Sequence, residues 1–430
     1  MVDECVEQTD KFGDRFKVWV TFDSNTLHRH AEEIQKRLDS GVPLRRLEGI
    51  PVGVKDIFNT IDLPTQMGSP LWRGFTPGND ARVVHSLRDA GAAIPGKTDT
   101  AEFAVHAIGN CLNPHDVTRT PGTSSSGSAV AVALGIVPVA VGTQTAGSIT
   151  RPASFCGVYG CKPSFGLIPR TGMLKTTDSL DTIGFFCAMQ EDIERMLDVL
   201  RVHGSNYPVS HAALTDDARQ DKPGNRPWRV ALVRTHTWDF AADYARDALV
   251  SFASRLAEDR NIVVNDVSVP AEMSSAHDVH QTIYDKTLSY YFRDEFENPD
   301  QISPIMKELI ERGQSVSVGS YHSALRAQDS LTHSMDDFFD DYDVIVSLST
   351  SGEAPPRNEM EQPDPSLMWT LTHLPVISAP VFTSPSQLPF GVQFAARKYN
   401  DLLLLRFTDY LARLGLIPSG VNPSARVESA

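Results

Sequence analysis

Apolar positions along the chain follow two different spacings, and these predict helices and strands in turn. Some segments repeat apolar residues every three or four positions, as an amphipathic helix does, whereas short continuous apolar runs are typical of buried strands. The predicted helices are 25–40, 80–90, 127–134, 191–201, 242–258 and 402–414, and the predicted strands are 49–54, 136–141, 229–233, 262–269, 344–346, 376–381 and 392–395. Because helices and strands alternate, we expect an α/β fold whose central mixed, mostly parallel β-sheet is covered by helices on both faces.

Three stretches differ in composition from the segments around them. Residues 203–227 are polar and contain Pro and Gly, which predicts a surface connection. Residues 274–326 contain several helical stretches with aromatic residues, among them Tyr284 and Tyr321. Between Thr120 and Gly166 the composition changes, and Gly, Ser, Thr and Ala replace large side chains.

Composition and charge narrow the class of protein. The chain has 430 residues, 41% of them hydrophobic and 22% charged, with a formal net charge of −15. Phosphate contacts dominate nucleic-acid affinity, so a chain this acidic is a poor direct binder of nucleic acid. No apolar run is long enough for a membrane span, and the first residues have no apolar signal core. The five cysteines are odd in number, and we expect reduced, buried thiols in a cytoplasmic protein.

Residues 91–98, GAAIPGKT, fit the phosphate-binding pattern GxxxxGK[ST]. A phosphate-binding loop follows a buried strand, but the segment before Gly91 has the pattern of a helix. Pro95 also removes one of the backbone N–H groups on which such a loop depends. We therefore expect a helix end that turns at Gly91 into a short strand, and no nucleotide site.

The stretch GTSSSGSA (residues 122–129), followed by GTQTAGSITRP (142–152), carries the candidate chemistry. It leads into an apolar run and so is not placed like a flexible linker. Serine needs a base before it acts as a nucleophile, and this stretch contains no histidine. Lysine can act as that base when burial lowers its pKa. Lys55 is the candidate, because the apolar run 49–54 delivers it from a predicted buried strand.

With these residues the chain resembles the amidase-signature family of serine hydrolases. The matching segments are GIPVGVKD (49–56), NPHDVTRTPGTSSSGSA (113–129), GTQTAGSITRPASFCGVYGCKPSFG (142–166), LPVISAPV (374–381) and LPFGVQFAAR (388–397). The resemblance implies one domain over residues 1–430. Its catalytic core would cover about 45–200 and 340–415, and a variable helical region at about 203–340 would line the substrate pocket.

The resemblance also implies a Ser–Ser–Lys triad and no cofactor or metal. Ser148 takes the place of the nucleophile, Ser124 that of the bridging serine that follows a cis peptide, and Lys55 that of the base. Backbone N–H groups of Thr145, Ala146, Gly147 and Ser148 would hold the oxyanion. Such an enzyme would cleave a carboxylic amide, and the same acyl chemistry would admit aryl amides, esters or carbamates. Ser125 either stabilises the loop or is an ordinary turn serine.

Several positions depart from the common family pattern. Thr123 and Ser126 stand where glycines are usual, Gln144 replaces an acidic residue, Ala146 replaces a glycine, and the arginine after the nucleophile is displaced to Arg151. These changes leave the triad intact, but they leave the substrate open. The candidate substrate-binding residues are Met67, Gly68, Cys111, Gln144 and Arg151.

We weigh four functions. The first is a stand-alone amidase acting on a small-molecule amide. The second is a glutamine amidase that works as one subunit of a tRNA-dependent amidotransferase complex, which would need a partner protein. The third is a non-catalytic scaffold, which the presence of all three triad residues disfavours, and the fourth is nucleotide binding. Many enzymes of this family form dimers, so the resemblance leaves a homodimer open.

Overall fold

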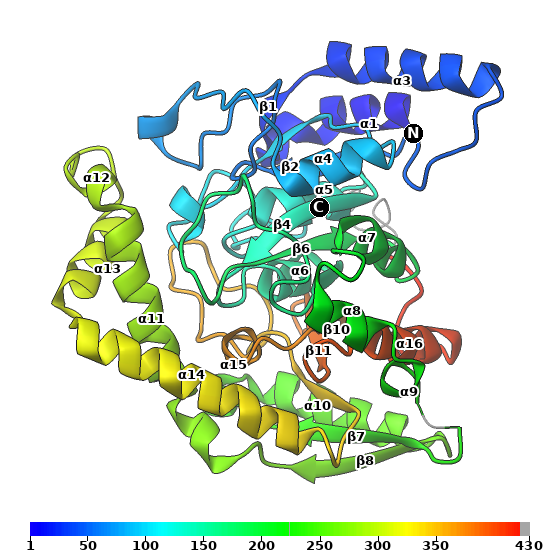
Figure 1. The fold of residues 1–430 in the computed structure, drawn as a ribbon, viewed down its shortest axis with the longest axis vertical. Coiled ribbons are helices and arrows are strands. Elements are labelled where there is room, and N and C mark those ends of the chain that lie inside the picture. The colour runs from blue at the N-terminus through cyan, green and yellow to red at the C-terminus, as the bar shows by residue number, and fades with distance from the viewer. Residues whose placement is uncertain (223, 422–430) are drawn as a thin grey trace.

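The computed structural model describes residues 1–222 and 224–421, and its centre is one sheet of eleven strands (Figure 1). The strand order is β1-β3-β2-β4-β6-β5-β10-β11-β9-β7-β8. The strands are β1 (Trp19–Phe22), β2 (Val52–Lys55), β3 (Gly96–Thr98), β4 (Val139–Gln144), β5 (Tyr159–Lys162), β6 (Thr182–Cys187), β7 (Trp228–Val233), β8 (Ile262–Val267), β9 (Val344–Leu348), β10 (Val376–Thr383) and β11 (Pro389–Ala395). The helices are α1 (Val2–Gln8), α2 (Asp14–Phe16), α3 (Ser24–Asp39), α4 (Arg82–Asp89), α5 (Ser126–Ala133), α6 (Thr150–Cys156), α7 (Asp192–Leu200), α8 (Pro208–Leu214), α9 (Asp217–Gln220), α10 (Asp243–Leu256), α11 (Ala276–Tyr291), α12 (Arg293–Phe296), α13 (Pro304–Ser315), α14 (Val318–Phe338), α15 (Leu367–Leu371) and α16 (Asp401–Arg413).

Side chains alternate between the two faces of the sheet, and each face meets its own helices. Val139 and Val141 of β4 lie in a core cluster with buried residues of α4, α7, α10 and α16. Ala140, between them, lies in a second cluster with α5 and α6. A third cluster joins α11, α13 and α14 to residues such as Ala231 of β7. The expected mixed α/β sheet with helices on both faces is therefore confirmed.

The prediction that the sheet is mostly parallel was wrong. Among the described strands, six of the ten pairings are antiparallel and four are parallel. The sequence pattern led us to expect a helical crossover between most strands, which would make neighbours parallel. Instead β10 and β11 form a hairpin, and β5 reaches β6 through a long loop without a helix. Such connections give antiparallel neighbours.

All thirteen predicted elements are present, with ends displaced by up to a few residues, but other elements were not foreseen. The polar N-terminal segment forms α1 and α2 and buries Cys5, Phe12 and Phe16. Strands β1, β5 and β6 were also missed. The predicted surface connection 203–227 contains α8 and α9, and its residue 223 lies outside the described chain.

Residues 203–340 are not only helical, because they contribute β7 and β8 to the common sheet. Figure 1 shows α11, α13 and α14 together along one side of the molecule, away from α1 and α3. Since one sheet runs through both ranges, we propose that the chain forms a single domain; residues 422–430 of the expected domain lie outside the described part.

The cysteines agree with the expectation of buried thiols, since all five are free and buried. None of the helices in the described ranges has the length and apolar character that a membrane span requires.

Candidate active site

Lys55 and the loop that carries Ser148 lie at the carboxyl ends of two neighbouring inner strands, β2 and β4. Strands β2 and β4 run parallel, with Val54 opposite Val141. Parallel strands end at the same edge, so Lys55 at the end of β2 lies beside the loop that follows β4. Ser124 comes to this edge from another direction, since it lies just before α5, which packs against both strands.

Lys55 is fully buried among hydroxyl groups. Its Nζ lies 2.8 Å from Ser124 Oγ, 3.0 Å from Ser125 Oγ and 3.0 Å from Thr143 Oγ1. Burial lowers the pKa of Lys55 from 10.5 to about 7, while the Asp181 carboxylate acts in the opposite direction. The amine therefore has a large neutral fraction near pH 7, and a neutral amine keeps a lone pair that can accept a proton.

The three hydroxyls around Lys55 are not equivalent. Ser125 Oγ donates to the Thr143 carbonyl at 3.1 Å, so toward Lys55 it can only accept. Ser124 has no such competing acceptor among the described residues, so its proton is free to point at the lysine. Ser125 thus stabilises the loop, which resolves the two interpretations left open by the sequence.

Thr123, the residue before Ser124, is hydrogen-bonded to two charged side chains, Glu361 and Arg151. The Thr123–Ser124 peptide is cis, as the family resemblance implied. Thr123 donates its N–H to Glu361 Oε1 at 3.1 Å and its hydroxyl to Oε2 at 2.8 Å. Its carbonyl accepts from Arg151 Nη2 at 3.0 Å, and Arg151 is paired with Glu361 at 3.0 Å. The unusual threonine and the displaced arginine are thus parts of one arrangement that fixes the Ser124 loop.

The loop of residues 145–148 has its carbonyl groups held from outside. The three donors are His280 Nε2 to Thr145 O at 2.8 Å, Thr370 Oγ1 to Ala146 O at 2.7 Å, and Arg151 N to Gly147 O at 2.9 Å. The N–H groups of Thr145, Ala146, Gly147 and Ser148, by contrast, have no acceptor within the described part of the chain. They remain available to an anionic oxygen. Gly147 has no alternative at its position, because a Cβ there would overlap the Asp364 carboxylate.

Ser148 lines a cavity of about 200 Å³. The other lining residues are Ala104, Val105, His106, Thr145, Ala146, Arg151, His280, Gln281, Tyr284, Arg312 and Leu367. Both arginines in this wall are already paired, Arg151 with Glu361 and Asp364, and Arg312 with Asp285 at 2.8 Å. Burial also lowers the pKa of His106 and of His280. The cavity is therefore polar, but it has no unpaired cation to attract an anionic acyl group.

The structure separates the five predicted substrate-binding residues. Arg151 lines the Ser148 cavity, whereas the other four are not among its lining residues. Met67 packs in the core with α11 and α13, and Gly68 takes a left-handed φ of 66° beside the Thr100 carbonyl. Cys111 is buried and donates its N–H to Asp99.

The Gln144 side chain joins β4, α6 and α15 through hydrogen bonds. Its Oε1 accepts from the N–H groups of Ile149 and Thr150 at 2.9 and 3.0 Å, at the start of α6. Its Nε2 donates to Ser366 and Thr370 hydroxyls, both at 3.0 Å. An amide can accept and donate at once, and so Gln144 replaces the usual acidic residue while linking the Ser148 loop to α15.

Sequence reasoning pointed to Tyr284 but missed His106, His280, Asp181 and Glu361. Asp181 is buried and accepts from the Thr145 hydroxyl at 2.8 Å and from Thr176 and Thr177. The segment Asp178–Thr182 contains no feature that marks Asp181 in one sequence. Its importance comes only from the approach of Lys55 and Thr145 in space.

The segment that resembled a phosphate-binding loop has another structure. Gly91 ends the turn after α4, and residues 96–98 form β3, as expected. Lys97 is buried, donates to Phe58 O at 2.7 Å and Thr65 Oγ1 at 2.8 Å, and pairs with Asp56 at 3.3 Å. Its charge is used inside the core.

Comparisons with known proteins identify the family. The family model described as Amidase matches residues 1–405. The chain belongs to the amidase family. It is an amidase, a hydrolase that cleaves amide bonds. Among its relatives, a glutamyl-tRNA(Gln) amidotransferase subunit of Synechococcus elongatus is 32% identical, with 84% of this chain and 83% of the relative covered.

Two further proteins show the range of the family. The putative amidase AmiD of Mycobacterium bovis is 30% identical, with 84% of this chain and 78% of the relative covered. A solved structure from a vestigial protein complex, connected with the origins of an s-triazine catabolic enzyme, has a TM-score of 0.85 at 25% identity. It covers 98% of this amidase and 96% of its own chain. The relatives thus include both a putative amidase and a subunit of an amidotransferase.

Proposed function

We propose that this amidase hydrolyses a small carboxylic amide through an acyl-enzyme on Ser148, with Ser124 relaying protons to Lys55. The observation that carries the proposal is the buried contact of 2.8 Å between Lys55 Nζ and Ser124 Oγ. A buried lysine whose nearest partners are hydroxyls rather than carboxylates is expensive to keep charged, and such a perturbed group is typical of catalytic sites.

The proposed proton relay runs from Ser148 through Ser124 to Lys55. Its Lys55–Ser124 contact is formed, whereas no hydrogen bond joins Ser124 to Ser148 among the described residues. Neutral Lys55 accepts the Ser124 proton, while Ser124 accepts the proton of Ser148 as Ser148 attacks the amide carbonyl. Catalytic hydrogen bonds often close only when substrate is bound, so the approach of Ser148 to Ser124 belongs to the Michaelis complex. The protons then return through Ser124 to the leaving amine. Water hydrolyses the ester on Ser148 by the same route.

The loop before Ser148 supports an oxyanion site. Its carbonyls are bound elsewhere, and its N–H groups at Ala146, Gly147 and Ser148 find no acceptor among the described residues. The N–H group of Thr145, the fourth donor expected from the sequence, likewise has no acceptor among the described residues, and the Thr145 hydroxyl donates to Asp181. The loss of one oxyanion donor typically costs about 10² to 10³ in rate.

The cavity suggests the acyl group. Its walls combine the rings of His106, His280 and Tyr284 with small apolar side chains, and its arginines are already neutralised. These features favour a small, uncharged acyl group with flat or polar parts. Of the candidate binding residues, we retain Arg151 as a wall residue, while Met67, Gly68, Cys111 and Gln144 would act on the pocket only through the elements they support.

A rate panel on purified protein tests the proposal. It would compare primary aliphatic amides, aryl amides, anilides, p-nitrophenyl esters and carbamates, with Ser148→Ala run beside the wild type. We expect turnover of at least one class and its loss in the variant. Turnover that survives in Ser148→Ala would place the chemistry elsewhere.

A second candidate is the glutamine-hydrolysing component of an amidotransferase complex, favoured by the 32% identity to the Synechococcus protein. It predicts a stable partner protein and low activity alone. Absence of turnover on the whole panel, together with a co-purifying protein that restores glutamine hydrolysis, would favour it. A homodimer stays a prediction that a sedimentation measurement would check.

A further inference from the structure

The helix α11 places His280 against the loop that precedes Ser148. His280, Gln281 and Tyr284 of this helix all line the Ser148 cavity. The His280 side chain is buried, and its Nε2 lies 2.8 Å from the Thr145 carbonyl oxygen. A carbonyl oxygen only accepts, so His280 Nε2 carries the proton in this contact.

The ring of His280 is fixed by its surroundings. It stacks on Tyr284 with 5.7 Å between ring centroids and 24° between the planes, and Tyr284 stacks in turn on His106 at 6.2 Å. Burial lowers the pKa of His280 to about 4. The imidazole is therefore neutral and a weak base at pH 7, which leaves hydrogen-bond donation as its contribution.

The hydrogen bond from His280 to the Thr145 carbonyl also affects the N–H group of the next residue, Ala146. The Thr145 carbonyl and the Ala146 N–H belong to the same planar trans peptide and point in opposite directions. A donor that holds the carbonyl therefore also sets the direction of the Ala146 N–H. It polarises the same peptide, which strengthens that N–H as a donor.

We propose that His280 is a positioning residue of this amidase, which acts through the Thr145–Ala146 peptide to aim the Ala146 N–H at the oxyanion. The inference rests on the proposed function, because it needs an oxyanion on the acyl group attached to Ser148. It adds a role for the helical region 203–340, which supplies a pocket wall and also orders the loop of the catalytic core.

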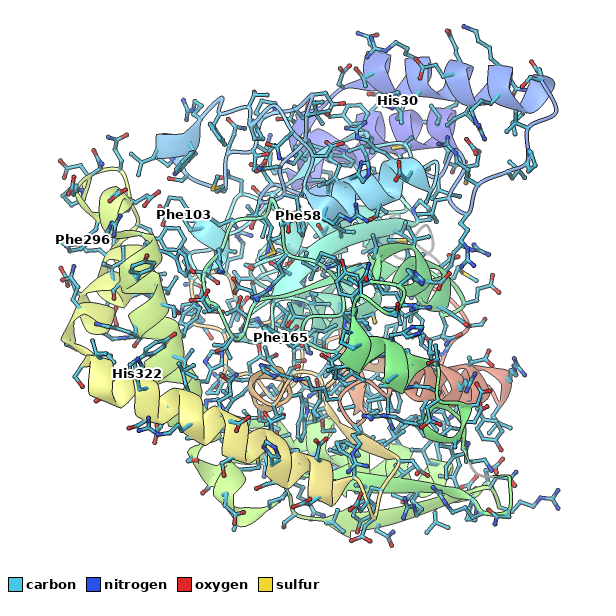
Figure 2. All side chains as sticks on the ribbon, viewed as in Figure 1. His30, Phe58, Phe103, Phe165, Phe296 and His322 are labelled. Carbon is cyan, nitrogen blue, oxygen red and sulfur yellow. The ribbon has the colours of Figure 1, made fainter. Side chains whose placement is uncertain are left out.

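Four proteins test this role: the wild type, His280→Phe, His280→Gln and the control His322→Phe. Phenylalanine keeps a flat ring against Tyr284 but removes the donor, whereas glutamine keeps an amide N–H of similar reach. His322 is an exposed histidine on α14, at the outer side of the molecule in Figure 2, so its replacement controls for loss of a histidine alone. If His280→Phe does not fold, His280→Met replaces it.

Steady-state rates would be measured on the amide that the panel identifies as the best substrate. We expect His280→Phe to lower kcat about 10-fold to 100-fold, because the donor acts on one of the four available N–H groups. KM should change less than about threefold. His280→Gln should recover most of the loss. An aldehyde with the same acyl group, which forms a tetrahedral adduct on serine, should lose affinity in parallel with kcat/KM, while the product acid should not.

Each contrary outcome has one meaning. Three outcomes would overturn the role of His280 while leaving the proposed function intact. They are a kcat for His280→Phe within twofold of wild type, a change confined to KM, and a glutamine variant as slow as the phenylalanine variant. If wild type neither turns over any substrate nor forms the adduct, the proposed function itself fails and the inference fails with it.

Discussion

Replacing Lys55 by methionine should change how stability depends on pH. Relative to wild type, the variant should lose stability as the pH rises from 7 to 9. In the native protein the pKa of Lys55 is lowered from 10.5 to about 7 by burial. Between these values the unfolded chain binds a proton that the native chain does not. Wild-type stability relative to a variant without the amine must therefore rise with pH across this window.

The size of the effect follows from the two pKa values. Deprotonation of Lys55 on folding costs wild type about 4 kcal/mol at pH 7 and about 2 kcal/mol at pH 9. Lys55→Met removes this cost but also loses three contacts to hydroxyls, each worth about 1 kcal/mol. The variant should therefore be as stable as wild type or slightly more stable at pH 7. Relative to wild type it should lose about 2 kcal/mol by pH 9.

Urea unfolding at pH 7 and pH 9 measures this difference, and other titrating groups cancel between the two proteins. Lys307→Met, which removes an exposed lysine of α13, is the matched control and should show the same difference at both pH values. A Lys55→Met variant whose stability relative to wild type stays constant, or improves, from pH 7 to pH 9 would refute a neutral buried Lys55.

Three further predictions concern activity. The kcat/KM of wild type should rise with pH through a midpoint near 7 and fall about tenfold per pH unit below it, because only neutral Lys55 accepts a proton. A flat profile from pH 5 to 8 would exclude Lys55 as the base. Asp181→Asn should move that midpoint to lower pH, since the carboxylate favours the charged lysine and raises its pKa; an upward shift would contradict the assignment. Glu361→Gln should lower kcat about tenfold or more, because it weakens the two hydrogen bonds to Thr123. Each of these charge-assisted bonds is worth about 2 kcal/mol. An unchanged rate would show that Ser124 does not depend on this support.

The parts of the fold that could be predicted are those whose signal is local. The run before Lys55 and the small-residue helix before Leu134 were found because apolar spacing reports burial directly. Strand β5 was missed because its four residues, Tyr159–Lys162, include a glycine and a lysine. Only the neighbouring strands make it a strand.

The site divides in the same way. Lys55, Ser124 and Ser148 were predicted from long motifs in one sequence. Glu361 and His280 were not, because each contacts its partner across more than 130 positions and stands in an ordinary local context. The contacts around Thr123 and Gln144 also show why the unusual residues at these positions are tolerated, since Glu361 and α15 supply the groups that they bind.

Trapping the acyl-enzyme on Ser148 tests the proposed chemistry most directly. Wild type, Ser148→Ala and Lys55→Met would each be mixed with a p-nitrophenyl ester, quenched in acid within one turnover and analysed by intact-mass and peptide mass spectrometry. We expect an acyl adduct on the peptide containing Ser148 in wild type, none in Ser148→Ala, and a much slower adduct in Lys55→Met. An acyl adduct of equal amount in Ser148→Ala, or on another residue of wild type, would contradict the proposed chemistry.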